Sequence, residues 1–357
     1  MRLLIAASGT GGHLFPAIAL AEQLPDMEIE WLGVPNRLET QLVPARYPLH
    51  TVAVEGFQQP LGVGSIAIVL RLAQSIWQVR KLLKEGKFDG LFTTGGYIAA
   101  PAIIAARSLS LPIIFHESNA LPGKVARWFS RWCNVAALGF EAAEEYFPPI
   151  QTAYLGTPVR TQFRTPQKLD LPLPTDVPLI VITGGSQGAV AINQLIRQCA
   201  PQWLAAGAWI FHQTGDKDPD VDSLQHPHYI AQPFYDNMAG LFQRANLAIS
   251  RAGAGTLTEL AVTHTPAILI PYPYAAENHQ AFNADVFVKA GAALVFNQSE
   301  LTAPLLESKV LELVRSPDLL AQMSTKAAAL AIPDSAERLA VLVQQLLTVG
   351  HRESGWL

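Results

Sequence analysis

The feature that most constrains this chain is a glycine-rich turn near its start, Ser8-Gly9-Thr10-Gly11-Gly12-His13, with Pro16 just beyond it. An apolar run typical of a strand, residues 3–7, precedes the turn, and a run typical of a helix, residues 17–24, follows it. Glycines at such a turn uncover backbone N–H groups at the positive end of the helix dipole, where a diphosphate binds well. Glycines can also serve there only for tight packing, so one such turn does not decide its function.

Residues 29–33 predict a second strand, so the chain opens as strand, helix and strand, as in a parallel doubly wound sheet. A dinucleotide site is the obvious rival interpretation. Its G-x-G-x-x-G pattern is broken because Leu14 occupies the third glycine's position, and the second strand ends in Gly33 rather than in a ribose-binding acid. We therefore rank an NAD-dependent oxidoreductase last among the functions considered.

Two more loops of the first half follow predicted strands. Gly95-Gly96-Tyr97 comes after the strand 91–94, and His116-Glu117-Ser118-Asn119 comes after the strand 111–115. Parallel strands end at one edge of a sheet, which is where open α/β sheets bind ligands. We expect these loops and the first glycine turn to meet in one crevice.

Two predicted helices of the first half, residues 64–87 and 124–132, combine large apolar side chains with cations at helical spacing. This pattern is typical of a surface that meets anionic lipid headgroups. The alternative is that the apolar side chains fill the core of the domain. The residues expected at a membrane are Ile66, Val69, Trp77, Arg80 and Lys84 in the first helix and Arg127, Trp128 and Arg131 in the second.

A proline-rich segment, residues 166–178, reads as a linker, and after it the chain repeats its opening device. The strand 179–183 is followed by Gly184-Gly185-Ser186-Gln187-Gly188 and a predicted helix over 189–200. A chain of 357 residues is comfortable for two cores. We expect an N-terminal domain of residues 1–157, a C-terminal domain of residues 158–333, and a final helix in residues 334–357.

Composition excludes several classes of protein. Half of the residues are hydrophobic and 15% are charged, which argues against disorder, and a net charge of −4 offers no global attraction for nucleic acid. The two cysteines make neither a disulfide framework nor a zinc site, and a reducing cytoplasm fits them. The apolar run after Arg2 is too short for a signal peptide, and no stretch reaches the roughly 20 apolar residues of a membrane span.

The second half carries two further candidate loops. The strand 247–250 runs into Arg251-Ala252-Gly253-Ala254-Gly255-Thr256, and Glu259 follows in the next helix. Glu259 could accept hydrogen bonds from ribose hydroxyls, or it could be an ordinary acid favoured by the helix dipole. The segment 271–280 ends in Asn278-His279-Gln280, which bind a ligand or are plain loop polarity.

Two glycine turns, one in each half, suit group transfer between two phosphorylated partners better than hydride transfer. If a sugar leaves a nucleoside diphosphate, the transition state resembles an oxocarbenium ion and the diphosphate gains charge, which helix N-termini can stabilise. We see no acidic pair typical of a Mg²⁺ site, so we expect no metal and no cofactor. His13 is the best-placed general base, although it could instead bind phosphate, and we expect His116 to support the neighbouring loop.

Seven ordered motifs across nearly the whole chain resemble those of the MurG family. They are Gly9 to Ala17, Gly95 to Tyr97, His116 to Asn119, Gly156 to Arg160, Gly184 to Gly188, Arg251 to Glu259 and Glu277 to Asn283. The resemblance implies a GT-B fold, with two Rossmann-like domains facing across a cleft and a final helix that crosses back to the N-terminal domain. It also implies an inverting transfer of N-acetylglucosamine from UDP-N-acetylglucosamine to the muramoyl 4-hydroxyl of undecaprenyl-diphospho-muramoyl-pentapeptide. That reaction converts lipid I to lipid II in peptidoglycan synthesis.

The same resemblance implies a peripheral enzyme on the cytoplasmic face of the bacterial plasma membrane. Its partners would be the two substrates, anionic lipid and other cell-wall synthesis proteins, with consequences for cell shape and division, and no nucleic acid. The acceptor contacts it implies are Gly11, Gly12, Gly95, Gly96, Tyr97 and Asn119. The donor contacts it implies are Thr10, Gly11, Gly12, His13, Asn119, Arg160, Gly185, Ser186, Tyr235, Ala254, Gly255, Glu259, His279 and Gln280.

The chain departs from the family pattern at three positions. Ser118 replaces a usual glutamine, Gly255 stands where a larger residue is common, and His279 stands where a glutamine can occur. Three other functions remain open on the sequence. A UDP-sugar 2-epimerase of this fold needs carboxylate acid/base groups and no membrane surface, a diacylglycerol glycosyltransferase shares the glycine-histidine loop, and a non-catalytic sugar-nucleotide binding subunit has no use for His13.

Overall fold

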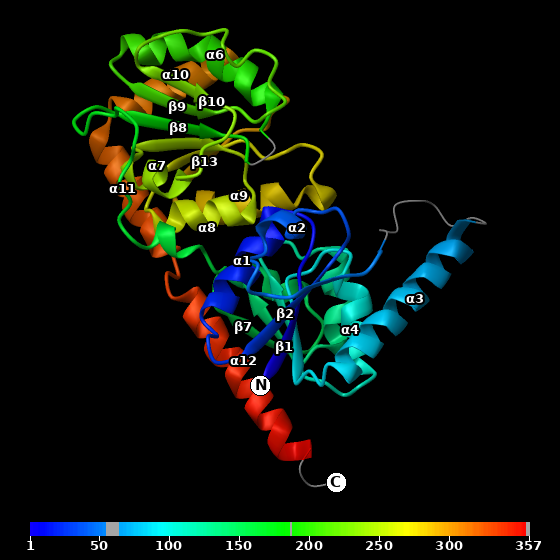
Figure 1. Ribbon diagram of the computed structural model, residues 1–357. Coiled ribbons are helices and arrows are strands. Elements are labelled where there is room, and N and C mark those ends of the chain that lie inside the picture. Colours follow the sequence, from blue (N-terminus) through cyan, green and yellow to red (C-terminus); the bar gives the residue numbers. More distant parts are fainter. Residues whose placement is uncertain (55–63, 186–187, 355–357) are drawn as a thin grey trace. The chain divides into compact units, whose positions relative to one another are not determined.

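The computed structural model describes residues 1–54, 64–185 and 188–354, with the backbone alone for residues 64–69 and 349–354. The chain divides into two compact units (Figure 1). The first unit holds residues 1–160 and 333–357, and the second holds residues 161–332. Residues 158–160, which we expected in the C-terminal domain, therefore belong to the first unit.

The first unit is built on a parallel sheet whose described strands follow the order β3-β2-β1-β4-β5-β6-β7. Every neighbouring pair is parallel, and Leu3 of β1, for example, lies opposite Ile29 of β2 and Gly90 of β4. The strands are β1 (Arg2–Ala6), β2 (Glu28–Gly33), β3 (Leu49–Thr51), β4 (Gly90–Thr93), β5 (Ile113–Glu117), β6 (Val135–Leu138) and β7 (Gln151–Tyr154).

Helices cover both faces of this sheet because successive side chains of its strands point to opposite sides. Leu3 and Ile5 of β1 pack with helices α1 and α12, whereas Leu4 and Ala6 pack with α3, α4 and α5. The helices are α1 (Gly11–Glu22), α2 (Glu39–Leu42), α3 (Gly64–Glu85), α4 (Ala99–Arg107), α5 (Lys124–Phe129) and α12 (Ser335–Ser354), with short 3₁₀ turns at Ser130–Trp132 and Glu141–Tyr146.

Helix α12 is the last helix of the chain, and it packs on the first unit beside α1 (Figure 1). Leu339, Val343 and Leu347 are four residues apart, so they lie along one side of the helix, and all three are fully buried. Leu347 reaches the sheet itself, since a Cβ on Gly90 would lie 2.3 Å from its Cδ2 atom. The expected return of the final helix to the N-terminal domain is confirmed.

The second unit repeats this architecture with the strand order β10-β9-β8-β11-β12-β13, again entirely parallel in the described residues. Its strands are β8 (Leu179–Thr183), β9 (Trp209–Gln213), β10 (Tyr229–Gln232), β11 (Leu247–Ser250), β12 (Ala267–Leu269) and β13 (Ala293–Val295). Its helices are α6 (Val190–Ala205), α7 (Met238–Arg244), α8 (Ala254–Val262), α9 (His279–Ala290), α10 (Ala303–Val314) and α11 (Pro317–Ala329), with 3₁₀ turns at Thr161–Phe163 and Ala276–Asn278.

In both sheets the unit's first strand lies between its second and its fourth. The direction of winding reverses there, between β1 and β4 and again between β8 and β11, and the carboxyl ends of strands at such a point leave room for a ligand. The two glycine turns follow β1 and β8, so each lies beside its unit's reversal point. The expected α/β class and the repetition of one doubly wound architecture are confirmed.

Several element boundaries differ from the sequence expectation, among them those of α1, β5 and α5. Helix α1 begins at Gly11 rather than at residue 17, so Pro16 lies inside the helix, where its missing N–H removes one backbone donor. Strand β5 continues through His116 and Glu117, and α5 ends at Phe129. His13 is therefore a helical residue, and His116 is a strand residue.

Candidate functional site

The first glycine turn is held from beneath by a buried acid. Glu39 is fully buried and accepts the backbone N–H of Gly9 at 3.2 Å and that of Val34 at 2.7 Å. Gly9 has a φ of 108°, a conformation that glycine adopts without strain. Among the described residues, the N–H groups of Thr10, Gly11 and Gly12 have no hydrogen-bond partner, and they stand at the N-terminus of α1. The turn thus presents donors that suit an anion.

His13 is tied to the next strand by two hydrogen bonds. Its Nδ1 atom lies 2.7 Å from the carbonyl oxygen of Thr94, and the Thr94 hydroxyl donates to the His13 carbonyl at 2.9 Å. A carbonyl only accepts, so in the neutral imidazole Nδ1 carries the proton and Nε2 carries the lone pair. The structure therefore sets the tautomer that a general base acting through Nε2 requires.

The second glycine turn packs directly on the first. Gly95 and Gly96 both have positive φ, of 96° and 76°. A Cβ on Gly96 would lie 2.9 Å from the carbonyl oxygen of Ser8, and one on Gly95 would lie 3.5 Å from the His13 ring. Tyr97 follows with its side chain exposed. The structure thus brings the two turns and His13 together, as the loop positions predict.

The third loop is organised by Glu117, a residue that sequence reasoning left without a role. Its carboxylate accepts the backbone and side-chain N–H groups of Asn119, both at 2.9 Å, and the N–H of Gly123 at 3.2 Å. Asn119 therefore has a fixed side-chain orientation. The signal was present in the sequence as an acid beside Asn119, but its partners are set by the turn of the loop.

His116 supports the neighbouring loop and does not reach solvent. Its Nε2 donates to the carbonyl of Gly156 at 3.1 Å, and burial lowers its pKa to about 4, against the raising effect of that hydrogen bond. The ring is therefore neutral at physiological pH. Arg160 follows in the same segment of chain, and its guanidinium stacks on the Phe15 ring of α1, with the Cζ atom 4.4 Å from the ring centroid.

The glycine turn of the second unit, residues 184–188, follows β8. The Gly185 N–H donates to the Thr183 hydroxyl at 3.1 Å, and Gly185 and Gly188 have φ of 85° and 70°. A Cβ on Gly188 would lie 2.2 Å from the Thr214 carbonyl oxygen, so this position needs glycine. Ser186, an expected donor contact, lies outside the described residues.

Gln213, at the end of β9, joins that turn to the loop after β10. Its Nε2 lies 3.4 Å from both the Thr183 hydroxyl and the Gly185 carbonyl, and its Oε1 accepts the Tyr235 N–H at 3.3 Å. The Tyr235 ring packs on Phe211 with centroids 5.2 Å apart, and its hydroxyl donates to Asp170. The neighbouring Phe234 is 56% exposed, which sequence reasoning did not anticipate.

Helix α8 begins at Ala254, directly after the loop that follows β11. Ala254 is buried, and a Cβ on Gly255 would meet no atom within 4 Å. Glu259 lies in the second turn of the helix and is half-buried. Arg251 serves the fold, since it donates to the carbonyls of Ile270 and Pro271 at 3.1 and 3.2 Å.

The loop before α9 has an unusual backbone. Glu277 and Asn278, which are consecutive and not glycine, both have positive φ, of 50° and 58°. Strained backbone of this kind concentrates at functional sites. The Gln280 side-chain oxygen accepts the Tyr272 N–H at 2.9 Å. His279 is half-buried, with its Nδ1 atom 2.9 Å from the Ala276 carbonyl oxygen.

Within the part of the chain that the structure describes, no group of three or more histidine, cysteine, aspartate or glutamate residues could hold a metal ion.

Two family models match the chain. The glycosyltransferase family 28 N-terminal domain matches residues 3–138, and the glycosyltransferase family 28 C-terminal domain matches residues 179–339. A curated protein from Nostoc sp., named UDP-N-acetylglucosamine--N-acetylmuramyl-(pentapeptide) pyrophosphoryl-undecaprenol N-acetylglucosamine transferase, is 67% identical over 350 residues, which are 97% of this chain and 98% of the relative. A protein of the same name from Trichodesmium erythraeum is 66% identical over 348 residues, covering 98% and 93% of the two chains.

Among solved structures, MurG from Acinetobacter baumannii is 31% identical, with a TM-score of 0.78 and coverage of 96% of this chain and 99% of that one. The chain belongs to the MurG family. Membership explains why both units carry a glycine turn at the reversal point of the sheet, since each family model spans one of these turns. At Gly255, where the resemblance leads us to expect a larger residue, the open space around the Cβ position would accommodate a side chain.

Proposed function

We propose that this protein is an inverting glycosyltransferase that moves N-acetylglucosamine from UDP-N-acetylglucosamine to the muramoyl 4-hydroxyl of undecaprenyl-diphospho-muramoyl-pentapeptide. The relatives at 65–67% identity carry the name of this transferase over nearly their full length. The observation in this chain that carries the proposal is the hydrogen bond from His13 to Thr94, which leaves the lone pair on Nε2.

His13 acts as the general base in this proposal. Its Nε2 takes the proton of the acceptor hydroxyl while the hydroxyl oxygen forms a bond to the anomeric carbon, and the bond from that carbon to UDP breaks. A single displacement inverts the anomeric configuration. The Thr94 carbonyl stabilises the imidazolium that forms, because the Nδ1–H that it accepts becomes more acidic.

The acceptor belongs to the first unit in this account. The N–H groups of Thr10, Gly11 and Gly12 bind its diphosphate at the N-terminus of α1, with Gly95, Gly96, Tyr97 and Asn119 around the muramoyl group. The outward-facing N–H groups at this turn and the side chain of Asn119, fixed by Glu117, support this assignment.

The donor belongs to the second unit. Gly185 and the start of α6 approach the diphosphate, Ala254 and Gly255 line the nucleotide, Glu259 binds the ribose hydroxyls, and His279 and Gln280 bind the sugar. Because the Tyr235 ring is engaged with Phe211 and Asp170, we assign the aromatic contact with uracil to the exposed Phe234 and leave the backbone of Tyr235 for hydrogen bonding.

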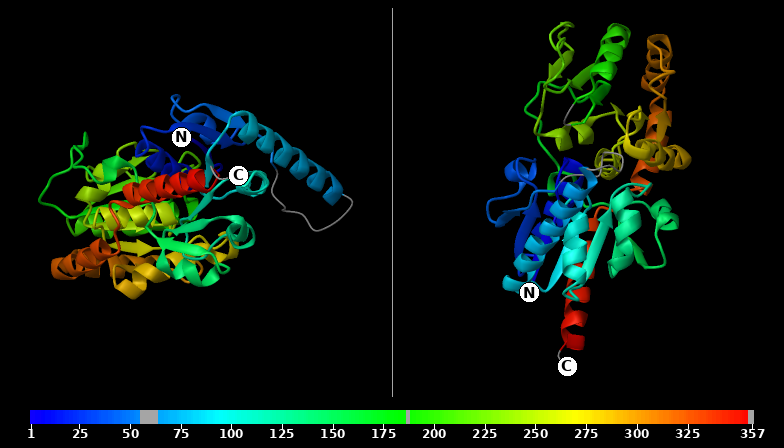
Figure 2. Two further views of the ribbon diagram at one scale, coloured as in Figure 1. Left: turned by 90° about the horizontal axis from the view of Figure 1, so that it is seen from below. Right: turned by 90° about the vertical axis from the view of Figure 1, so that its right-hand side faces the viewer.

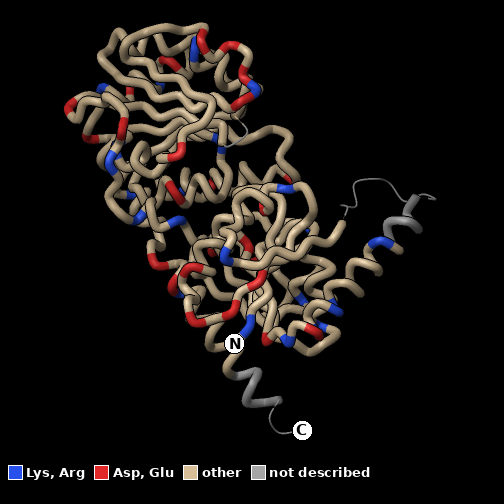
Figure 3. The backbone as a smooth tube through the Cα atoms, in the orientation of Figure 1, with Lys and Arg blue, Asp and Glu red and all other residues tan. Residues whose placement is uncertain are grey.

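A lipid-linked acceptor requires a membrane surface, and α3 and α5 offer one. No helix within the described residues is long and apolar enough to cross a membrane. Trp77 and Trp128 are 63% and 60% exposed, and Figure 2 shows α3 along the outside of the first unit. Lys and Arg positions gather towards the C-terminal end of α3 (Figure 3). We place this surface on anionic lipid at the cytoplasmic face of the plasma membrane.

The expected membrane residues do not all contribute equally. Lys84, Arg80 and Arg131 are all exposed. The Arg80 Nε also donates to the Ser108 hydroxyl at 2.9 Å, and the Arg131 Nε donates to the Trp128 carbonyl at 3.0 Å. Arg127 is half-buried. Val79 and Leu83 fill the core, so α3 has a buried face and an exposed one. The side chains of Ile66 and Val69 lie outside the described residues.

The proposed function is tested by incubating the purified full-length protein with UDP-N-acetylglucosamine and either a lipid I analogue or diacylglycerol. Mass spectrometry should show one N-acetylglucosamine added to the lipid I analogue alone. Addition to diacylglycerol would favour the membrane-lipid glycosyltransferase, and conversion of the sugar nucleotide without an acceptor would favour the 2-epimerase. Either result would overturn the proposal.

A further inference from the structure

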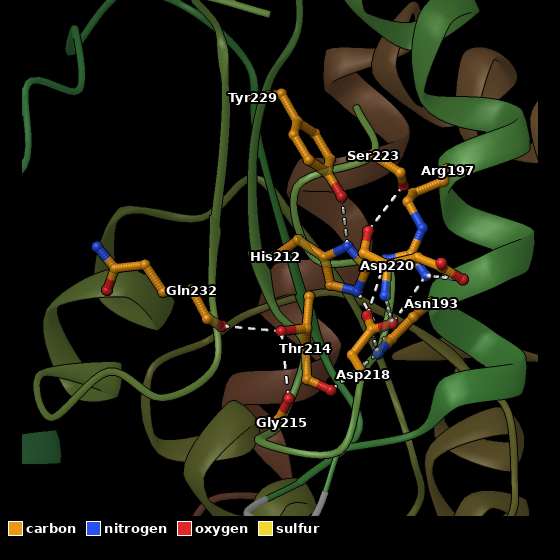
Figure 4. Close-up of polar contacts among 10 residues, drawn as sticks. All are labelled: Asn193, Arg197, His212, Thr214, Gly215, Asp218, Asp220, Ser223, Tyr229 and Gln232. Atoms are coloured by element: carbon orange, nitrogen blue, oxygen red, sulfur yellow. Dashed lines mark hydrogen bonds and ion pairs between the residues drawn. The ribbon is translucent and has the colours of Figure 1, made fainter. Parts of the chain in front are cut away.

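A buried polar network lies beside the glycine turn of the second unit and is separate from the residues assigned above (Figure 4). It joins α6, β9 and β10 through His212, which is fully buried. The His212 Nδ1 lies 2.7 Å from the Tyr229 hydroxyl, and its Nε2 lies 3.0 Å from Oδ1 of Asn193.

The Asn193 side chain uses all of its hydrogen-bonding groups. Its Nδ2 donates to the Thr214 carbonyl and to the Asp218 carboxylate, both at 2.8 Å. Arg197 neutralises that carboxylate with two hydrogen bonds, of 2.8 and 3.0 Å. Since both N–H groups of Asn193 are donated, its Oδ1 must accept, and His212 must supply the proton.

The protonation of His212 agrees with this direction of bonding. Burial, aided by the nearby Arg197 charge and opposed by Asp218, lowers the pKa of His212 to about 3, so the ring is neutral with one N–H. That N–H is on Nε2, and Nδ1 accepts from the Tyr229 hydroxyl. Burial raises the pKa of Tyr229 to about 12, so this hydroxyl keeps its proton. At physiological pH the hydrogen bonds therefore run in one direction, from the Tyr229 hydroxyl to His212 and from His212 to Asn193.

The far end of the network touches the turn itself. Asn193 donates to the Thr214 carbonyl, whose oxygen would lie 2.2 Å from a Cβ on Gly188. The Cα of Gly215 would lie 2.8 Å from the same Cβ. The backbone of Gly188 therefore packs directly on the backbone of Thr214 and Gly215. Asn193 lies in the first turn of α6, which begins at Val190, so its hydrogen bond to the Thr214 carbonyl fixes the start of that helix against the backbone of Thr214 and Gly215.

We propose that His212 is a positioning residue of the nucleotide site. By orienting the Asn193 amide, His212 sets the distance between the N-terminus of α6 and the backbone of Thr214 and Gly215, on which Gly188 packs. This distance determines the position of the backbone N–H groups that bind the UDP diphosphate. This inference rests on the proposed function. A network that served stability alone would have no effect on UDP affinity in a folded variant.

The test is UDP binding to the full-length protein by calorimetry at 25 °C, with thermal unfolding measured in parallel. His212→Phe keeps a ring but removes both nitrogens, and it should weaken UDP binding about tenfold, the effect of losing one or two buried hydrogen bonds. His212→Gln keeps a donor near Nε2 and should restore affinity to within about threefold. In turnover, the KM for UDP-N-acetylglucosamine should rise while kcat stays near that of the unchanged protein.

Leu313→Ala is the matched control, because Leu313 is a buried side chain of α10 in the same core and makes no polar side-chain contact. It should lower the unfolding temperature and leave UDP affinity unchanged. Tyr229→Phe, which removes only the distal hydroxyl, should weaken UDP binding about twofold to threefold and serves if His212→Phe does not fold. Unchanged UDP affinity in the folded His212 and Tyr229 variants would overturn the inference. Failure of the unchanged protein to bind UDP would contradict the proposed function itself.

Discussion

At the scale of single residues, the account depends first on His13. If its Nε2 removes the acceptor proton, His13→Ala should lower kcat by about 100-fold or more, the usual effect of removing a general base, and change UDP affinity much less. Steady-state kinetics with a lipid I analogue, together with UDP calorimetry, measure both quantities. Retained kcat with a raised acceptor KM would instead make His13 a phosphate ligand.

Glu259 carries the proposed recognition of ribose. Glu259→Gln keeps the shape of the side chain but replaces a charged acceptor, so UDP binding should weaken by about 1 to 3 kcal/mol. Glu312→Gln is the control, since Glu312 pairs with Lys309 at 2.8 Å on the surface of α10. Calorimetry showing equal UDP affinity for both variants and the unchanged protein would remove Glu259 from the site.

Several residues that shape the site could not be predicted from the sequence. His13 and Asn119 lie in motifs whose residue types indicate a binding or catalytic role. Glu39 and Gln213 do not, because each acts on a glycine turn that lies about 30 residues away in the chain, through hydrogen bonds that only the parallel sheet brings into reach. Tyr235 is the converse case, since an aromatic residue in a polar loop suggests stacking on a ligand, while its ring already packs on Phe211.

At the scale of elements, α3 should bind anionic membranes through its exposed side. Replacing Trp77 with Ala and Lys84 with Glu should reduce co-sedimentation with phosphatidylglycerol vesicles at low salt, because each cation near the surface contributes about 1 kcal/mol. Lys84→Glu alone is compared with Lys217→Glu, an exposed lysine of the second unit that gives the same change in net charge.

Transfer to a short-chain soluble acceptor should remain nearly intact in the α3 variants, while transfer to a long-chain acceptor slows. Binding of all variants should fall as salt rises, because salt screens the attraction. Equal binding of the Lys84 and Lys217 variants would show that α3 does not meet the membrane.

The elements themselves were largely predictable, since the apolar runs of 179–183 and 247–250 match β8 and β11 residue for residue. The start of α1 was not, because three glycines and a proline conceal a helix whose first turn is stabilised by tertiary contacts rather than by propensity. The buried and exposed sides of α3 also required the structure, because Val79 and Trp77 look equally apolar in the sequence.

At the scale of the whole molecule, each unit contains one buried neutral imidazole among its described side chains, His116 in the first and His212 in the second. Unfolding returns their pKa values from about 4 and about 3 to about 6.5, so below that pH the unfolded chain binds more protons than the folded one. Stability should therefore fall as pH drops through 6.5, by up to about 1.4 kcal/mol per imidazole per pH unit.

Urea unfolding followed by fluorescence at pH 7, 6 and 5.5 measures this effect above the range in which carboxylates protonate. His116→Gln should show a shallower dependence, whereas the exposed His226→Gln should behave as the unchanged protein does. A urea midpoint that stays constant over this range would contradict the burial of neutral imidazoles.

The two-unit architecture follows from the sequence because the second half repeats the strand, glycine turn and helix of the first. The return of α12 to the first unit does not follow from periodicity, which shows an apolar side of that helix without naming its partner. The spacing of Leu339, Val343 and Leu347 predicts a buried stripe, and only the packing against α1 identifies the surface that receives it.

The central claim is that the chain couples departure of UDP to glycosylation of a lipid-linked muramoyl acceptor. Its most direct test is UDP release from UDP-N-acetylglucosamine by the full-length protein, measured with and without a lipid I analogue. The account predicts release that depends on the acceptor, with one N-acetylglucosamine-containing product formed for each UDP. Release at the same rate without the acceptor, or no release when both substrates are present, would contradict it.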